Sequence, residues 1–300
     1  MRVRVPAKVN LVLRVGSVRD DGYHELTTVF HALSLFDEVG VAPAPPGTGV
    51  TLDLVGEGAD ALPRDAANLA VRAALMAAER AGRPADLAIS VTKAIPVAGG
   101  MAGGSADAAA VLVACAALWD GSLPREDLPG LALALGSDVP FLLEGGTMLG
   151  TGRGEVLVPI LARGDFHWVI AVSDGGLSAA EVYAELDRQR GAHPPDAGAE
   201  DARDALLALR AGDACALGYA LRNDLQPAAL ALRPALSRVL EAGADLGALG
   251  GIVSGSGPTC VFLARDREHA LDIAVGLTTT GLVRSVRHAT GPVAGAQLVR

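Results

Sequence analysis

The sequence predicts a protein of mixed α+β class. Helical and strand periodicities interleave along its 300 residues in no regular β-α-β-α order, which favours a mixed α+β architecture over a doubly wound sheet. Half of the residues are hydrophobic and one fifth are charged, as expected of a folded chain with ample material for a core. The length suits one large or two ordinary domains, and we place a boundary near residue 160, between domains of residues 1–160 and 161–300.

The first predicted element is a strand over the first fifteen residues. Hydrophobic residues occupy the odd positions from Val3 to Val15, whereas basic residues and an asparagine occupy most of the even ones. This period of two is typical of a strand, in which successive side chains point to opposite faces. Lys8 and Asn10 therefore project side by side from one face of a rigid element.

Turn residues and helical periodicity predict the rest of the first half. The expected elements are a turn at residues 20–22, a strand pair over 23–39, a loop over 41–50, a helix over 68–81, a strand over 87–92 and a helix over 108–118. The helix over 68–81 has apolar residues at helical spacing and ends at Gly82, which suits a left-handed C-terminal residue. The order that matters is strand, glycine-rich loop, helix.

The second half repeats this mixture without an internal repeat. The expected elements are strands over 146–158 and 167–172, a helix over 179–190, a loop over 191–200, helices over 201–210 and 234–242, a glycine turn running into a strand over 250–262, a helix over 267–276 and a strand over 282–288. We therefore expect helices and strands throughout both domains.

Composition excludes several classes of function. A formal net charge of −9 argues against general nucleic-acid binding, which needs a dense basic surface. No apolar run reaches the roughly 18–20 residues of a membrane span, and no continuous apolar segment follows the basic N-terminus, so we expect neither a membrane protein nor a signal peptide.

The three cysteines are scattered singly, at Cys115, Cys215 and Cys260. They form neither a disulfide framework nor a zinc pattern, and a reducing cytoplasm fits best.

Four glycines precede the helix over 108–118, at Gly99, Gly100, Gly103 and Gly104, and Ser105 follows them. Glycine permits positive φ and removes Cβ, so that several backbone N–H groups can converge on one anion at a helix start. Phosphate is the natural ligand of such a loop. The alternative is a tight strand-to-helix connection in which Ser105 is the N-cap. The loop is neither a Walker A motif nor a Rossmann fingerprint.

Three short motifs stand out: PVAGGMAGGSA at residues 96–106, GSGPT at residues 255–259 and PAKVNL at residues 6–11. Together they resemble the motifs of the GHMP kinases, the small-molecule kinases named for galactose, homoserine, mevalonate and phosphomevalonate. The first resembles the phosphate loop of this family, the second its C-terminal glycine motif and the third its N-terminal motif. Within the family, residues 19–26 and 136–141 are similar to the members that phosphorylate a CDP-linked methylerythritol. The resemblance spans essentially the whole chain.

The resemblance implies a fold, a cofactor and a phosphate site. The fold would have an N-terminal ribosomal protein S5 domain 2-like domain and a C-terminal ferredoxin-like domain, with the active site in the cleft between them. ATP and Mg²⁺ would be the cofactors. The ATP phosphates would lie on Pro96, Val97, Ala98, Gly99, Gly100, Met101, Ala102, Gly103, Gly104, Ser105 and Ala106. Many members have a second Ser where this chain has Ala106, which puts one secondary contact in doubt.

By the same resemblance, Lys8 and Asp138 form the catalytic pair. Phosphoryl transfer needs positioning, charge stabilisation and a group that orients the attacking hydroxyl, a role that suits Asp138. The alternatives are that Asp138 caps a turn before Pro140 and that Lys8 is an exposed residue of an edge strand. Asp107, expected in the first turn of its helix, and Glu144 are candidate Mg²⁺ ligands, although such a site takes few protein ligands.

The expected acceptor is the 2-hydroxyl of the methylerythritol part of the CDP-linked substrate. Tyr23, His24 and Phe30 form a candidate pocket for the base, since an aromatic face can stack on a pyrimidine, although a core pair in a hairpin explains them equally well. Asn10, Gly255 and Ser256 are further candidate substrate contacts; residues 255–258 could also be only a tight turn. Arg153 is either an anion contact or a solvated loop residue.

Two rival functions stay open at this point. Another GHMP kinase, acting on mevalonate, homoserine or a sugar, would share the glycine loop without needing Tyr23 and His24. A catalytically silent metabolite-binding protein could use the same scaffold, but the presence of Lys8 and Asp138 speaks against it. A small molecule is the expected substrate, and the sequence implies no protein partner.

Overall fold

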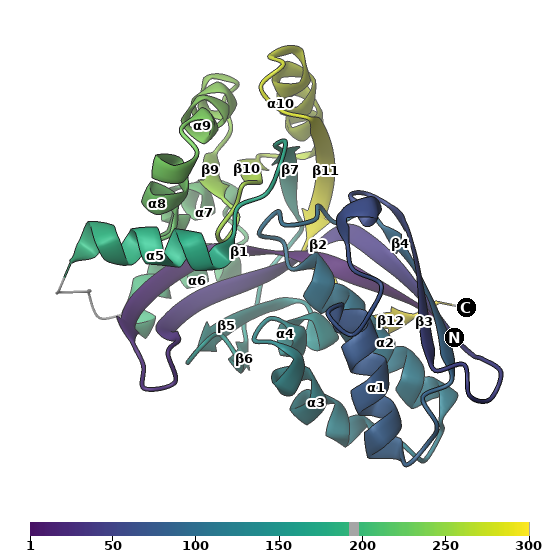
Figure 1. The fold of residues 1–300 in the computed structure, drawn as a ribbon. Coiled ribbons are helices and arrows are strands. Elements are labelled where there is room, and N and C mark those ends of the chain that lie inside the picture. The colour runs from purple at the N-terminus through teal and green to yellow at the C-terminus, as the bar shows by residue number, and fades with distance from the viewer. Residues whose placement is uncertain (192–197, 300) are drawn as a thin grey trace.

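Two long antiparallel strands run through the centre of the protein (Figure 1). The computed structural model describes residues 1–191 and 198–299. Strand β1 (Arg2–Val18) confirms the predicted first strand, and it pairs with β2 (His24–Pro43) along most of its length. The strand pair expected over residues 23–39 is wrong, because β2 is continuous. The polar residues His31 and Asp37 that interrupt its apolar pattern are buried with hydrogen-bond partners and mark no turn.

The larger sheet grows outward from these two strands in the order β12-β1-β2-β4-β3. Its other strands are β3 (Val50–Gly56), β4 (Leu87–Lys93), β5 (Thr147–Thr151), β6 (Val156–Pro159), β8 (Arg222–Asn223) and β12 (Gln297–Leu298). Strands β4, β5 and β6 confirm predictions, whereas β3 was not predicted. The predicted loop over 41–50 is shorter than expected, because β2 extends to Pro43.

Helices α1–α4 gather on one side of β1 and β2 in Figure 1. They are α1 (Leu69–Ala81), α2 (Gly103–Leu118), α3 (Leu128–Leu135) and α4 (Val139–Glu144). The Asn68 side chain caps α1 by accepting from the Ala70 N–H, and Gly82 ends the helix at φ 60°, as predicted. Helix α2 begins within the glycine run, earlier than predicted, and its buried alanines belong to the same hydrophobic cluster as those of α1.

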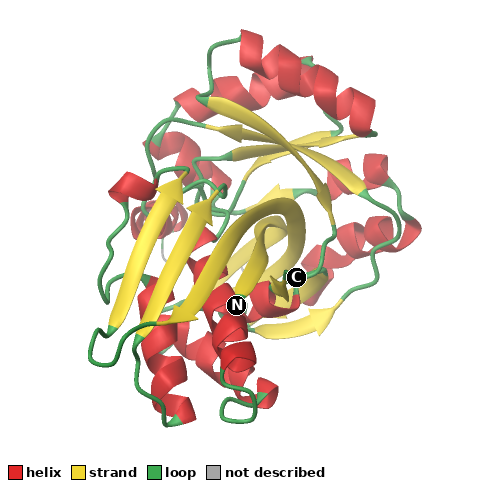
Figure 2. Ribbon diagram, turned by 90° about the vertical axis from the view of Figure 1, so that its right-hand side faces the viewer, coloured by secondary structure: helices red, strands yellow, loops and turns green. Residues whose placement is uncertain are grey.

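The second sheet has the order β11-β7-β10-β9 and carries helices on its outer side (Figure 2). Its strands are β7 (Phe166–Val172), β9 (Gly250–Val253), β10 (Cys260–Ala264) and β11 (Ser285–Gly291). The surrounding helices are α5 (Ala179–Arg190), α6 (Arg203–Ala211), α7 (Ala214–Ala220), α8 (Gln226–Leu232), α9 (Ala235–Asp245) and α10 (Arg267–Thr279). Residues 250–262 form a strand, a turn and a second strand, where one strand was expected. Most of the loop predicted over 191–200 lies outside the described residues.

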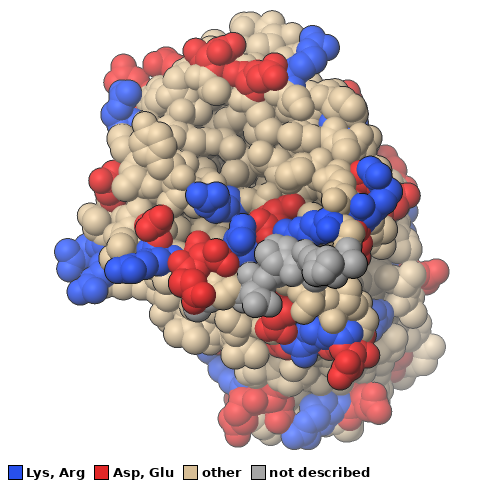
Figure 3. Space-filling view, turned by 90° about the vertical axis from the view of Figure 1, so that its left-hand side faces the viewer, with Lys and Arg blue, Asp and Glu red and all other residues tan. Residues whose placement is uncertain are grey.

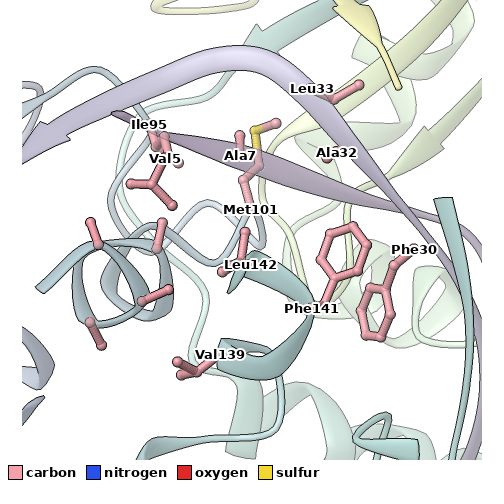
Figure 4. Packing of buried hydrophobic residues seen from close by; sticks show 14 of the residues in the cluster. Val5, Ala7, Phe30, Ala32, Leu33, Ile95, Met101, Val139, Phe141 and Leu142 are labelled. Atoms are coloured by element: carbon pink, nitrogen blue, oxygen red, sulfur yellow. The ribbon is translucent and has the colours of Figure 1, made fainter. Parts of the chain in front are cut away.

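Strand β1 belongs to both halves of the molecule. Val12 and Leu13 on it pair with β8, and the neighbouring Arg14 forms ion pairs with Asp224 at 2.9 Å and with Asp201 at 3.3 Å. The main hydrophobic cluster extends from α1 and α2 through β1 and β2 to Trp168 on β7. Part of it is visible in Figure 4, where Phe30 of β2 and Phe141 of α4 lie ring to ring. The boundary near residue 160 stays a prediction.

The surface and the helices add two observations. Basic and acidic side chains are interspersed on the face shown in Figure 3, so this face has no extended basic field. Within residues 1–191 and 198–299, none of the helices combines the length and the apolar character that crossing a bilayer requires.

Candidate active site

A cavity of about 530 Å³ lies between β1, β2, the glycine loop, α4 and α5. Its walls include most of the predicted site residues: Lys8, Asn10, Phe30, Pro96, Val97, Ala98, Gly99, Gly100, Ala102, Gly103, Gly104, Ser105, Asp138, Gly255 and Ser256. Met101, Ala106, Tyr23 and His24 are absent from this lining. The first two have side chains that are fully buried in the core, where Figure 4 shows Met101 close to Ala7.

The glycine loop, residues 96–106, turns sharply into α2. Among the described residues, Ala98 and Ala102 are the only non-glycine residues with positive φ, 50° and 60°. Ala102 is the N-cap of α2 and supplies no side-chain hydrogen bond, while Ser105 lies inside the helix. The alternative in which Ser105 caps the helix is therefore wrong. The first N–H groups of α2 lack a side-chain cap and adjoin the cavity, which suits an anion.

A turn at residues 254–259, in the second half of the chain, packs against this loop. The Ser254 hydroxyl donates to the Gly100 carbonyl oxygen at 3.1 Å. A Cβ on Gly100, whose φ is +74°, would stand 1.9 Å from the Ser254 carbonyl oxygen, and a Cβ on Gly99 would stand 2.7 Å from the Thr259 hydroxyl. Close backbone approach thus explains two of the glycines, since any side chain would push the loop out of place.

Lys8 and Asp138 lie close together in the lining of the cavity. The Lys8 ammonium is 3.7 Å from a carboxylate oxygen of Asp138, and their side chains are 6% and 32% exposed. Lys8 also donates to the Asn10 side-chain oxygen at 2.7 Å, and the Asn10 amide donates to the Thr28 hydroxyl at 2.8 Å. The Thr28 hydroxyl in turn donates to the Val12 carbonyl at 2.8 Å. This chain of bonds fixes the Lys8 ammonium in the cavity wall, so Lys8 is not an exposed edge-strand residue.

Helix α4 positions Asp138. Asp138 is the N-cap of α4, yet its side chain makes no capping hydrogen bond. Val139 and Phe141 anchor the helix in the core, with the Phe141 ring stacked on Phe30 at 4.9 Å between centroids. The carboxylate is therefore held at the cavity and accepts no hydrogen bond from the N–H groups at the start of the helix, so the alternative that Asp138 is only a cap is wrong.

A second lysine, Lys93 at the end of β4, contacts the glycine loop. Its ammonium bonds to the carboxylates of Asp37 and Asp107 and, at 3.2 Å, to the Gly103 carbonyl. All three side chains are at most 2% exposed. Burial raises the pKa of Asp107 to about 8, with a further rise from Asp37 and an opposing effect of Lys93. Since one lysine faces two carboxylates, a proton on Asp107 leaves the cluster neutral.

Comparisons with known proteins agree over nearly the whole chain. Family models for the GHMP kinases N terminal domain and the GHMP kinases C terminal domain match residues 68–146 and 205–281. The 4-diphosphocytidyl-2-C-methyl-D-erythritol kinase of Mycolicibacterium gilvum is 59% identical, covering 99% of this chain and 92% of that protein. The enzyme of the same name from Mycobacterium tuberculosis is 57% identical over the same shares.

The chain belongs to the GHMP kinase family.

Solved structures confirm the two-domain GHMP kinase fold. A crystal structure of 4-(cytidine 5'-diphospho)-2C-methyl-D-erythritol kinase superposes with a TM-score of 0.78 at 34% identity, covering 97% of this chain and 98% of that one. A homoserine kinase from Cytophaga hutchinsonii superposes with a TM-score of 0.78 at 20% identity, which shows the fold alone. The fold and the family expected from the three motifs are thus confirmed, and this GHMP kinase is an ATP-dependent kinase.

The predicted base contacts Tyr23 and His24 lie beside the cavity lining, in contact with two residues that belong to it. One is Tyr183, which the sequence analysis did not name, and the other is Arg153, which it left open as an anion contact. His24 stacks on Tyr183 of α5 at 5.0 Å and lies 2.9 Å from Asp187. Tyr23 is 53% exposed, and the Arg153 guanidinium lies over its ring at 4.6 Å. Tyr183 and Arg153 line the cavity directly. Burial, helped by the charge of Asp138, raises the pKa of Tyr183, which keeps its hydroxyl neutral.

Neither candidate Mg²⁺ ligand is available at this site. Asp107 lies beyond the first turn of α2, not in it as predicted, and is bound to Lys93 at 2.7 Å. Glu144 is exposed at the end of α4 and is absent from the cavity lining. Among the described residues, no group of three or more His, Cys, Asp or Glu side chains could hold a metal ion. Ser105 and Asp138 also line the cavity, and two side-chain oxygen ligands would suit an ion that keeps its phosphate and water ligands.

Proposed function

We propose that this GHMP kinase transfers the terminal phosphoryl group of ATP to the 2-hydroxyl of 4-diphosphocytidyl-2-C-methyl-D-erythritol. The observation that carries the proposal is the Lys8–Asp138 pair, 3.7 Å apart, on the wall of the same cavity as an uncapped, glycine-rich helix start. Relatives that are 57–59% identical over nearly full length carry the name of this kinase. The products are the 2-phosphate and ADP, a step of the non-mevalonate route to isopentenyl diphosphate.

In this mechanism Asp138 orients the acceptor hydroxyl and accepts its proton as the oxygen attacks the terminal phosphorus. The bond from that phosphorus to the bridging oxygen of ATP breaks, and ADP leaves with the electron pair. Lys8 stabilises the negative charge on the transferring group, and the N–H groups at the start of α2 hold the other phosphates. Asn10 serves mainly to fix the Lys8 ammonium, because both of its polar atoms have protein partners.

Mg²⁺ enters this proposal together with ATP. Ser105 and Asp138 are the side chains that would hold the ion, and the ion would neutralise phosphate charge.

The acceptor's cytosine base lies against the aromatic wall in this proposal. The rings of His24 and Tyr183 stack and Tyr183 lines the cavity, while the exposed ring of Tyr23 lies under Arg153, which also lines it. A pyrimidine gains from an aromatic face and from polar groups at its edge. Phe30 supports this wall from within, because it is buried and stacked on Phe141. The proposed activity requires no protein partner, and a cytoplasmic location stays a prediction.

ADP release tests the function directly. Purified protein with ATP and Mg²⁺ should release ADP with 4-diphosphocytidyl-2-C-methyl-D-erythritol as acceptor, and not with mevalonate or homoserine. Asp138→Asn, which keeps the shape of the side chain, should lower kcat by about 10²–10⁴-fold, the usual contribution of a positioned general base. Turnover of mevalonate or homoserine without turnover of the CDP-linked acceptor would refute the proposal.

A further inference from the structure

Three cationic side chains line the cavity, and two of them already have carboxylate partners. Lys8 faces Asp138, and Lys93 is enclosed by Asp37 and Asp107. The third is Arg153, which forms no ion pair with any residue in the ranges 1–191 and 198–299. Its one side-chain interaction in these ranges is with the Tyr23 ring, at 4.6 Å. Arg153 is therefore the cation whose charge is left for a ligand.

Arg153 is held by a tight turn between β5 and β6. The Leu26 N–H donates to the Gly152 carbonyl at 2.7 Å, and the Gly152 N–H donates to the Glu25 carboxylate at 3.2 Å. Gly154, with φ 100°, lies against Phe30, so that a Cβ there would stand 3.3 Å from that ring. The turn is thus bound to β2 by two hydrogen bonds at Gly152 and packs on β2 at Gly154, and it places the guanidinium over the Tyr23 ring in the cavity lining.

The contact with Tyr23 leaves Arg153 able to bind an anion. A guanidinium stacked on a ring still presents its N–H donors in its own plane, and this fork matches the oxygens of a phosphate. The half-buried position weakens solvent screening of the charge. A guanidinium without a carboxylate partner, in the lining of the same cavity as the glycine loop, is suited to neutralise a second polyphosphate.

We propose that Arg153 binds the diphosphate of the nucleotide-linked acceptor and makes this kinase prefer acceptors that carry it. The inference rests on the proposed function, in which the triphosphate of ATP and the diphosphate of the acceptor bind in the same cavity. The glycine loop and α2 provide for the triphosphate of ATP, whereas the diphosphate of the acceptor needs a cation of its own. Arg153 is a specificity-determining residue that takes no part in the transfer of the phosphoryl group.

Inhibition by CDP and by cytidine, measured against the CDP-linked acceptor at saturating ATP, isolates this contact. The two inhibitors share the base and the ribose but differ in the diphosphate. We expect Arg153→Met to weaken CDP by about 10- to 100-fold, in line with a lost charge-assisted bidentate contact, and to leave cytidine nearly unchanged. Arg153→Lys should fall between wild type and Arg153→Met, since an ammonium keeps the charge without the fork.

A matched control is Arg188→Met on α5. Arg188 is exposed, pairs with Glu185 and is absent from the cavity lining, so the same change of charge there should alter neither inhibitor. The KM for ATP should also stay unchanged in Arg153→Met. If Arg153→Met weakens inhibition by CDP and by cytidine equally, or leaves inhibition by CDP unchanged, the role of Arg153 is overturned. The proposed function still stands in that case, provided that the wild-type protein turns over the CDP-linked acceptor. A wild-type protein that neither uses that acceptor nor binds CDP would overturn both.

Discussion

Lys8 and Lys93 line the same cavity from strands of the same sheet, but their surroundings differ. Lys8 has one amide partner and a carboxylate 3.7 Å away that is one-third exposed. Lys93 directs its three donors to two buried carboxylates and a carbonyl. An ammonium has three N–H donors, so Lys93 has none to spare, whereas Lys8 can turn a donor toward a phosphoryl oxygen. A lysine suited to catalysis differs from a structural lysine by having an N–H donor without a protein partner, and not by its burial alone.

The largest effect should follow from removing the buried cation. Lys93→Met leaves Asp37 and Asp107 buried without a positive partner, and breaking a buried ion pair in this way costs about 3–5 kcal/mol. We therefore expect a large loss in the free energy of unfolding, measured with urea, and poor recovery of folded protein. If Lys93→Met unfolds at the same urea concentration as wild type but no longer turns over its substrates, the roles assigned to the two lysines would be reversed.

The second effect should appear in the rate and not in stability. Lys8→Met removes a cation from the transferring group, and kcat should fall by about 10²–10³-fold, as when one preorganised donor is removed from an active site. Its melting temperature should stay close to that of wild type, because the Asp138 carboxylate left behind is partly exposed to water. Near-normal turnover in a folded Lys8→Met protein would rule out the catalytic role.

A smaller effect is a dependence of stability on pH that originates at Asp107. Burial raises the pKa of Asp107 from the ordinary 3.8 to about 8, so between these values the folded protein holds a proton that the unfolded chain has lost. This contribution to stability is complete below pH 4 and is lost as the pH rises through 8.

Urea unfolding of wild type and Asp107→Asn between pH 5 and 8.5 measures this contribution. The free energy of unfolding of wild type should fall relative to that of the variant by at least about 1.4 kcal/mol, the equivalent of one pKa unit. Parallel profiles would show that Asp107 stays ionised beside Lys93.

The parts of the site that lie close together in sequence were predictable. The alternation around Lys8, the helix that ends at Gly82 and the glycine run before Ser105 each reflect a local rule of backbone or side-chain geometry. The resemblance to the family added Asp138, whose short helix begins with a proline at its second residue and gives little periodic signal.

The parts that depend on distant segments were not predictable. Lys93 meets Asp37 across 56 positions, and His24 meets Asp187 across 163. Tyr183 reaches the cavity only because α5 lies against β2, and no local pattern around Tyr183 encodes that contact. Asp107 misled the prediction of a metal ligand for the same reason, since its partner comes from the preceding strand and not from its own helix.

Strand β1 limits how this kinase can open. Lys8, near the middle of the strand, bonds through its N–H to the glycine loop, and residues 12–14 tie the strand to the second half through the β8 pairing and the Arg14–Asp224 ion pair. Swinging the halves apart would have to bend this single strand or break those ties. Ligands should therefore enter and leave by movement of side chains and turns at the rim, with the frame of the molecule staying rigid throughout the reaction cycle.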